Sequence, residues 1–136
     1  MNMSDPAGIL VLDTSKGVVS IRVGQIIRIQ SIGNYSKLFF KNGKTLVVAK
    51  VLHLFEVHPQ LSSFVRIHRK HLVNIDYVET YHTHRTFVLI LNNGETIAVA
   101  RRKKRSIGER LNKLNYGFTD NAASSSSFRT RKILAA

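Results

Sequence analysis

Two Asn-Gly dipeptides constrain this chain more than any other feature, because each stands between two short segments rich in β-branched residues. Asn42-Gly43 separates residues 35–41 from 45–49, and Asn93-Gly94 separates residues 86–91 from 96–99. Asn-Gly between alternating apolar segments is the strongest short-range signal for a β-hairpin. The sequence therefore predicts two antiparallel hairpins.

The two hairpins belong to a weak internal repeat. Residues 38–50 overlay residues 89–101. Each copy is followed by a helical pattern with a cation at its start, Lys50 in the first copy and Arg101 in the second. Two copies are too few for a solenoid. The hairpins could equally have converged on the same turn chemistry, so the repeat leaves both origins open.

Other segments extend this β pattern along the chain. Strand-like segments and an opening hairpin are predicted at residues 9–12, 17–23, 26–31, 64–67 and 75–81. Two segments instead show the i, i+3, i+4 apolar spacing of a helix: residues 49–57, which Pro59 ends, and residues 101–114. Together they predict a mainly β, antiparallel hairpin fold with one or two short helices.

Composition sets the limits of the domain. An apolar content of 43% in 136 residues fits one globular domain. We expect an N-terminal extension with a first strand at 1–16, the domain at 17–116, and a disordered, basic, Ser-rich tail at 117–136.

The chain has no cysteine, which excludes disulfides. The apolar segment 8–12 is too short for a signal-peptide core or a membrane span, so a cytoplasmic location is expected.

Charge points to the class of partner. Twenty-one Lys and Arg against eight Asp and Glu give a formal net charge of +13. An excess of this size attracts polyanions, nucleic acid first and an anionic membrane surface second. Four of the basic and imidazole side chains follow one another from His68 to His71, and the next acid is Asp76. Burying such a cluster is costly, so the stretch predicts a turn held out from a β scaffold.

Three motifs resemble one known family. Residues 64–74, Phe-Val-Arg-Ile-His-Arg-Lys-His-Leu-Val-Asn, are similar to the F-x-R-x-H-R-S-Y-L-V-N signature of the LytTR-type DNA-binding domain. Residues 26–35 resemble that family's first strand and its G-N-Y turn, and residues 96–102 resemble its closing P-V-S-R-R segment. The resemblance runs from about residue 17 to 114, and the three motifs occur in the family's order.

The resemblance implies an elongated antiparallel β fold and a bacterial transcription regulator of the response-regulator type, here without a receiver segment. It implies that loops read the major groove of double-stranded DNA, at direct-repeat sites and with a homodimer on DNA. The base-contacting residues carried over from the motifs are Asn34, Tyr35, Arg69 and Arg101. Lys70 and His71 stand where the family has Ser and Tyr, and Ala100 stands where it has Ser, which changes the DNA sequence expected.

The chemistry of these side chains agrees with that assignment. The arginine fork can donate two hydrogen bonds to O6 and N7 of guanine, and Asn can bond N6 and N7 of adenine. Cations at a helix N-terminus oppose the helix dipole, so the cluster at 101–105 needs a compensating use such as phosphate binding. The expected phosphate contacts are Lys37, Lys70, His71, Arg102, Lys103, Lys104 and Arg105.

Each assignment has a structural alternative. Arg69 could form a surface ion pair with Asp76 or Glu79, and Arg101 could be a solvated residue at a helix start. Gly33-Asn34 is also ordinary turn chemistry. His68 and Asn74 are expected to bond backbone groups instead of DNA, because buried polar groups need partners.

Other functions lack their usual residues. His68, His71, His82 and His84 invite a metal interpretation, but cysteines are absent and acids are few, so no metal or cofactor is expected. No nucleotide-binding or hydrolase motif occurs, which argues against an enzyme. An RNA or single-strand binding module is the alternative, and it would need exposed aromatic side chains, for which Tyr35, Phe39, Phe87 and Tyr116 are available. A module for anionic membranes would lack an apolar face beside residues 101–105, so membrane binding is not expected.

Overall fold

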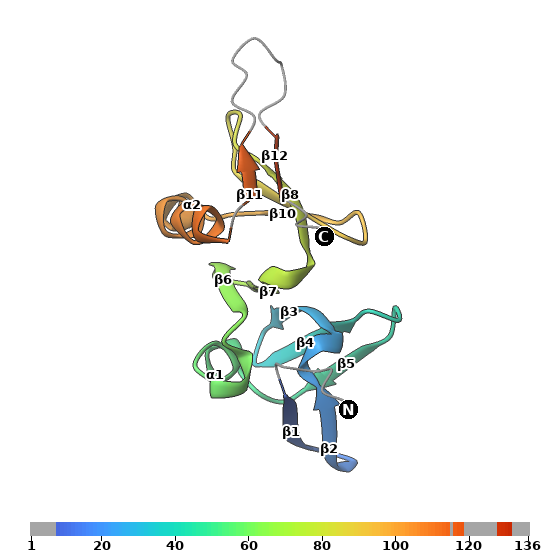
Figure 1. Cartoon of the computed structure of the whole chain (residues 1–136). Helices are drawn as coiled ribbons and strands as arrows, with labels where there is room; N and C mark the ends of the chain where they lie inside the picture. The colour runs from blue at the N-terminus through green and yellow to red at the C-terminus, as the bar shows by residue number, and fades with distance from the viewer. Residues whose placement is uncertain (1–7, 115, 119–127, 132–136) are drawn as a thin grey trace. The chain divides into compact units, whose positions relative to one another are not determined.

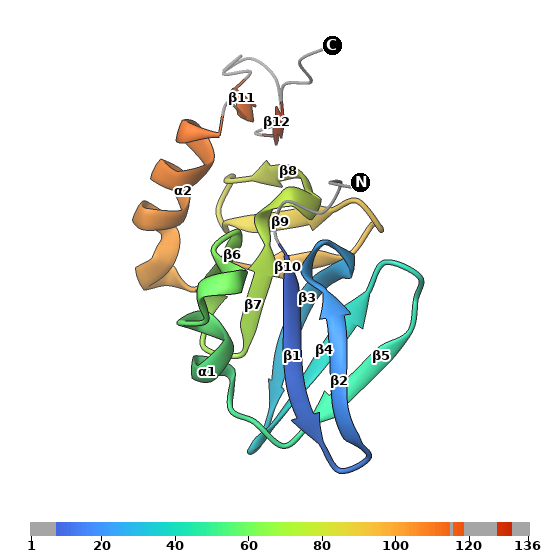
Figure 2. The same ribbon diagram turned by 60° about the horizontal axis from the view of Figure 1, so that its bottom comes forward.

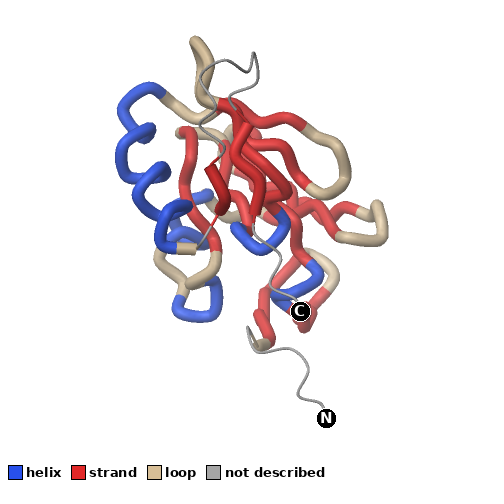
Figure 3. Tube along the Cα trace, turned by 45° about the horizontal axis from the view of Figure 1, so that its top comes forward, coloured by secondary structure: helices blue, strands red, loops and turns tan. Residues whose placement is uncertain are grey.

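The computed structural model describes residues 8–114, 116–118 and 128–131, which fall into two units (Figure 1). The first unit ends at Asp76 and the second begins at Tyr77. Strands form most of the regular structure (Figure 3), and all described strand pairs are antiparallel. The expected mainly β, antiparallel fold with two short helices is confirmed.

The first unit contains a hairpin, a five-stranded sheet and a short helix. Its main elements are β1 (Ile9–Thr14), β2 (Gly17–Arg22), β3 (Ile26–Ile32), β4 (Tyr35–Phe40), β5 (Thr45–Val48), α1 (Leu52–Glu56), β6 (Phe64–His68) and β7 (His71–Asn74). Short 3-10 helices are η1 (Val23–Gln25), η2 (Pro59–Leu61) and η3 (Ile75–Tyr77), the last at the junction with the second unit. The strand order β5-β4-β3-β7-β6 makes β3 the central strand.

The core of the first unit lies between the β1–β2 hairpin and one face of the sheet (Figure 2). Strand geometry directs alternate side chains to this core, for example Leu10 and Leu12 of β1. The helix α1 lies against β3, β6 and β7 and adds Phe55, which is fully buried. The helix therefore supports β3, β6 and β7, the strands that lead into or out of the turns described below.

The second unit is a second antiparallel sheet with one helix. Its elements are β8 (Val78–His82), β9 (Val88–Leu91), β10 (Thr96–Ala98), η4 (Arg101–Lys103), α2 (Lys104–Lys113), β11 (Tyr116–Phe118) and β12 (Phe128–Arg131), in the strand order β10-β9-β8-β12-β11. The helix α2 buries Ile107 and Leu111. Phe87 stacks on Tyr81 with ring centroids 5.4 Å apart, and it lies close to Gly108 of α2.

The two Asn-Gly turns have the same geometry, and each loop is three residues long. In the first, the Gly43 N–H donates to the carbonyl of Phe40 (2.9 Å), and the Phe40 N–H donates to the carbonyl of Lys44 (2.9 Å). In the second turn, the Gly94 N–H donates to the carbonyl of Leu91 and the Leu91 N–H donates to the carbonyl of Glu95, both at 2.8 Å. The glycines have φ of +88° and +89°, as expected for a turn followed by a left-handed residue.

Three segments differ from the sequence-based prediction. Residues 49–51 are not helical, and Val51 is extended (φ −79°, ψ 155°), so α1 begins only at Leu52. The second helix begins with the 3-10 turn η4. Within the predicted disordered tail, residues 117–118 and 128–131 are strands, because β12 pairs with β8 and β11 pairs with β12. The rest of that tail lies outside the described residues.

Candidate nucleic-acid interface

The turn between β3 and β4 carries two of the residues expected to contact bases. Ile32 pairs with Tyr35, which leaves Gly33 and Asn34 as a two-residue loop. Gly33 has φ +60°, a left-handed conformation that favours glycine. Asn34 is exposed, and Tyr35 is 51% exposed. Both side chains are therefore accessible to a large ligand.

The turn between β6 and β7 is shorter than the sequence indicated. His68 pairs with His71, so only Arg69 and Lys70 stand at the tip, and both are exposed. The following residues, through Asn74, form β7 between β3 and β6. The cationic cluster is thus divided between a tip and the ends of two strands.

Arg66 holds this turn in shape. Its Nε donates to the carbonyl of His68 (3.1 Å) and its Nη2 donates to the carbonyl of Arg69 (2.6 Å). Its Nη1 donates to Oε1 of Glu56 on α1 (2.8 Å). His68 adds a further bond, because its Nδ1 accepts the backbone N–H of Lys70 (3.1 Å). A turn fixed in this way has less freedom to lose when Arg69 meets a ligand.

Asn74 is a structural residue, as expected. It is 1% exposed, and its Nδ2 donates to the carbonyl of Ile26 (3.0 Å). Its Oδ1 accepts the N–H of Asp76 (3.1 Å) and the hydroxyl of Ser63 (3.2 Å). These bonds join β7 to the start of β3 and account for the polar atoms of a buried amide.

Strand pairing brings the two turns to the same end of the sheet. The central strand β3 pairs with both β4 and β7, with Gln30 opposite His71. The N–H of Ser31 donates to the carbonyl of Lys70 (2.9 Å), which joins the end of β3 directly to the β6–β7 turn. The two turns therefore lie side by side and present their exposed polar tips together.

A third basic residue belongs to this end of the sheet. The buried hydroxyl of Ser36, at the start of β4, donates to the carbonyl of Lys50 (2.6 Å). This bond holds the segment after β5 beside the β3–β4 turn. Lys50 was not among the residues selected from the sequence, although the internal repeat aligns it with Arg101 and could have indicated it.

Two of the expected phosphate contacts lie away from the turn tips. Lys37 is half-buried on the sheet, with its Nζ 5.2 Å from the ring centroid of Phe39, and Arg28 covers the same ring at 3.7 Å. His71 is also half-buried, and its ring centroid is 5.3 Å from that of His68. Neither has the exposure of Arg69 or Lys70.

The remaining candidates lie in the second unit, where β10 leads into η4 and α2. Arg101, Arg102 and Arg105 are exposed, whereas Lys103 and Lys104 are half-buried. Neither η4 nor α2 has an acidic residue in its first turn, and no side chain caps the start of either helix. Arg105 has its Nε 3.7 Å from Glu109. Five consecutive cations therefore surround a helix N-terminus, where each opposes the helix dipole.

Three possibilities raised by the sequence can be compared with the described residues. Among residues 8–76 Arg69 forms no ion pair, so the alternative of a pairing with Asp76 is not seen there. Over residues 8–114, 116–118 and 128–131, no three His, Cys, Asp or Glu side chains come together as a metal site would require. No helix in that part of the chain is long and apolar enough to cross a bilayer.

Comparisons with known proteins agree with this fold. The model of the LytTr DNA-binding domain family matches residues 16–112. A solved structure, the LytTr DNA-binding domain of a Bacillus cereus protein described as a methyl-accepting/DNA response regulator, is similar with a TM-score of 0.62 and 22% identity. That similarity covers 76% of this chain and 95% of the other. A search of curated proteins finds no significant match. The chain belongs to the LytTR family of DNA-binding domains.

Proposed function

We propose that the protein binds double-stranded DNA in a sequence-specific manner and acts as a transcription regulator in the bacterial cytoplasm. Asn34, Tyr35 and Arg69 contact base edges in the major groove from the first unit, and Arg101 does so from the second. The sites are direct repeats, occupied by two copies of the chain. Membership of a DNA-binding family and a net charge of +13 favour a polyanionic partner.

One observation carries the proposal: an exposed arginine stands at the tip of a turn whose backbone is already held by Arg66 and His68. Specific base contacts need a donor fork in a defined orientation, since two bonds must meet O6 and N7 of one guanine. The neighbouring β3–β4 turn adds the amide of Asn34 and the phenol of Tyr35, so the same end of the sheet offers a second kind of base contact.

The other cations have a positioning role in this proposal. Lys37, Lys70 and His71 in the first unit, and Arg102, Lys103, Lys104 and Arg105 in the second, contact phosphates. Such contacts add affinity and orientation but no direct sequence information. We add Lys50 to this group because its backbone lies beside the start of β4, where Ser36 bonds its carbonyl.

Selection of bound duplexes from a random pool, followed by fluorescence anisotropy, tests the proposal. The selected duplex should bind more tightly than a scrambled duplex, either of its single strands or the corresponding RNA. Equal affinity for a single strand would overturn it. That outcome would favour the alternative of a single-strand or RNA module. Two of its candidate stacking residues are unsuited to that role, because Phe87 is buried and Phe39 is covered by Arg28, whereas Tyr35 is exposed.

A further inference from the structure

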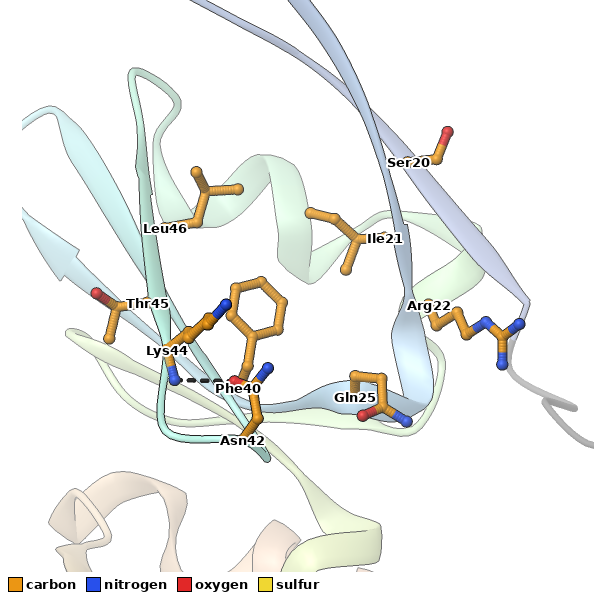
Figure 4. A pocket seen from close by; sticks show the side chains of 9 residues that line it. All are labelled: Ser20, Ile21, Arg22, Gln25, Phe40, Asn42, Lys44, Thr45 and Leu46. Atoms are coloured by element: carbon orange, nitrogen blue, oxygen red, sulfur yellow. Dashed lines mark hydrogen bonds between the residues drawn. The ribbon is translucent and has the colours of Figure 1, made fainter. Parts of the chain in front are cut away.

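A groove of about 420 Å³ opens in the first unit between β2 and the β4–β5 hairpin (Figure 4). Its floor is apolar and consists of Ile21 from β2, Phe40 from β4 and Leu46 from β5, whose side chains point toward one another across the opening. All three are only partly buried and pack against the core of the unit. The groove is therefore an incompletely covered flank of that core.

One wall of the groove is a strand edge. The N–H of Val23 donates to the carbonyl of Gly8 (3.0 Å), which sets the alternation of bonds between β1 and β2. Ile21 is accordingly bonded to β1, whereas Ser20 and Arg22 direct their backbone N–H and C=O groups away from it. Figure 4 shows the side chains of Ser20 and Arg22 pointing out of the groove, so these two residues line it with their backbone.

The mouth of the groove is cationic. Lys44, an exposed residue, lines the groove together with Phe40 and brings a positive charge to it (Figure 4). None of the nine described residues that line the groove is acidic. An occupant thus meets an apolar floor, a row of backbone donors and acceptors, and a positive charge.

We propose that this groove binds an extended peptide segment of a partner protein. The segment adds as a third strand to the edge of β2 that pairs with no other described strand. The segment alternates apolar residues, directed onto Phe40 and Leu46, with residues that face solvent, and it carries a carboxylate for Lys44. Strand addition draws affinity from the backbone and selectivity from alternate side chains. A small aromatic acid could use the floor and Lys44, but it would leave the edge of β2 unused.

This surface is separate from the DNA-binding turns. The strand β4 runs from Tyr35, beside the β3–β4 turn, to Phe40 at the groove, so the two sites lie at opposite ends of the same strand. A partner in the groove leaves Asn34 and Arg69 accessible. The proposal therefore goes beyond DNA binding and can fail or succeed independently of it.

Titration of the isotope-labelled full chain with three synthetic heptapeptides, followed by NMR, tests the proposal. Their sequences alternate valine with glutamate, serine with glutamate, or valine with lysine. The Val/Glu peptide should bind roughly tenfold more tightly than the others and shift the amides of Ser20, Arg22 and Leu46. The Ser/Glu peptide has the same charge, so it controls for non-specific attraction to a basic protein.

Matched variants locate the site. Lys44→Glu should weaken binding of the Val/Glu peptide, while Lys41→Glu, on the same hairpin but outside the groove, should not. Ser20→Pro removes an outward N–H and should weaken binding, while Val18→Pro removes an equivalent N–H away from the groove. Equal thermal unfolding temperatures of each variant and its matched control show that both are folded.

Three results would overturn the proposal. The Val/Glu and Ser/Glu peptides could bind equally, which would mean that the peptides bind through their charge alone. The shifts could fall instead on another hollow of the first unit, which is lined by Val11, Leu54 and Val57 among others. The anionic dye anilinonaphthalene sulfonate could bind in the groove while the Val/Glu peptide does not, which would make it a small-molecule site.

Discussion

At the scale of single residues, Arg66 and Arg69 have opposite roles. The guanidinium of Arg66 donates three hydrogen bonds, to two backbone carbonyls and a carboxylate. Arg69 instead accepts one of these bonds through its backbone carbonyl, and its side chain is exposed. Both belong to the motif that resembles the family signature. The sequence indicated Arg69 because it lies in a cationic run. It could not indicate the role of Arg66, since that depends on the conformation of the β6–β7 turn and on where α1 places Glu56.

Replacement of Arg69 by Ala should weaken binding of the selected duplex by about 1–3 kcal/mol and relax the base preference at one position. Arg69→Lys should recover part of the affinity but little of the preference, because an ammonium lacks the fork that bonds O6 and N7 together. Anisotropy on duplexes with each base pair changed in turn measures both quantities. Wild-type preference in Arg69→Ala would remove this residue from the base contacts.

Replacement of Arg66 by Lys tests whether the fixed turn matters. The net charge is unchanged, but one ammonium cannot reproduce the three bonds to His68, Arg69 and Glu56. We expect affinity for the selected duplex to fall by about 1 kcal/mol, since the turn must now be ordered on binding. Affinity for a scrambled duplex should stay the same. An equal loss on both duplexes would mean that Arg66 acts through its charge.

At the scale of elements, local signals were sufficient for the hairpins but not for the complete sheets. Asn42-Gly43 and Asn93-Gly94 determine their turns through their own backbone preferences, and both hairpins were predicted. The strands β11 and β12 were missed because β12 depends on β8, a partner far away in the sequence. Likewise, the joint placement of Asn34 and Arg69 follows from β3 pairing with both β4 and β7, which no local pattern contains.

The start of α2 permits a test that separates stability from binding. Arg102 is exposed next to a helix N-terminus, so Arg102→Gln should raise the free energy of unfolding slightly, by about 0.3–1 kcal/mol at low salt. The same change should weaken binding to all duplexes alike and lower the slope of log Kd against log salt by about 1. Lys113→Gln, at the other end of α2, is the matched control and should leave the slope unchanged. An unchanged slope in Arg102→Gln would exclude Arg102 from the phosphate contacts.

At the scale of the whole molecule, net charge and sequence preference should act through different groups. A charge of +13 attracts any duplex, whereas in the proposed function discrimination depends on a few exposed side chains at the turns and at η4. If the cations of the site neutralise about 6–10 phosphates, log Kd should rise linearly with log salt, with a slope of roughly 5–9. A scrambled duplex should show nearly the same slope, because its phosphates are identical. A slope below about 2 on both duplexes would show that the cations at residues 101–105 and at the β6–β7 turn do not contact the DNA backbone.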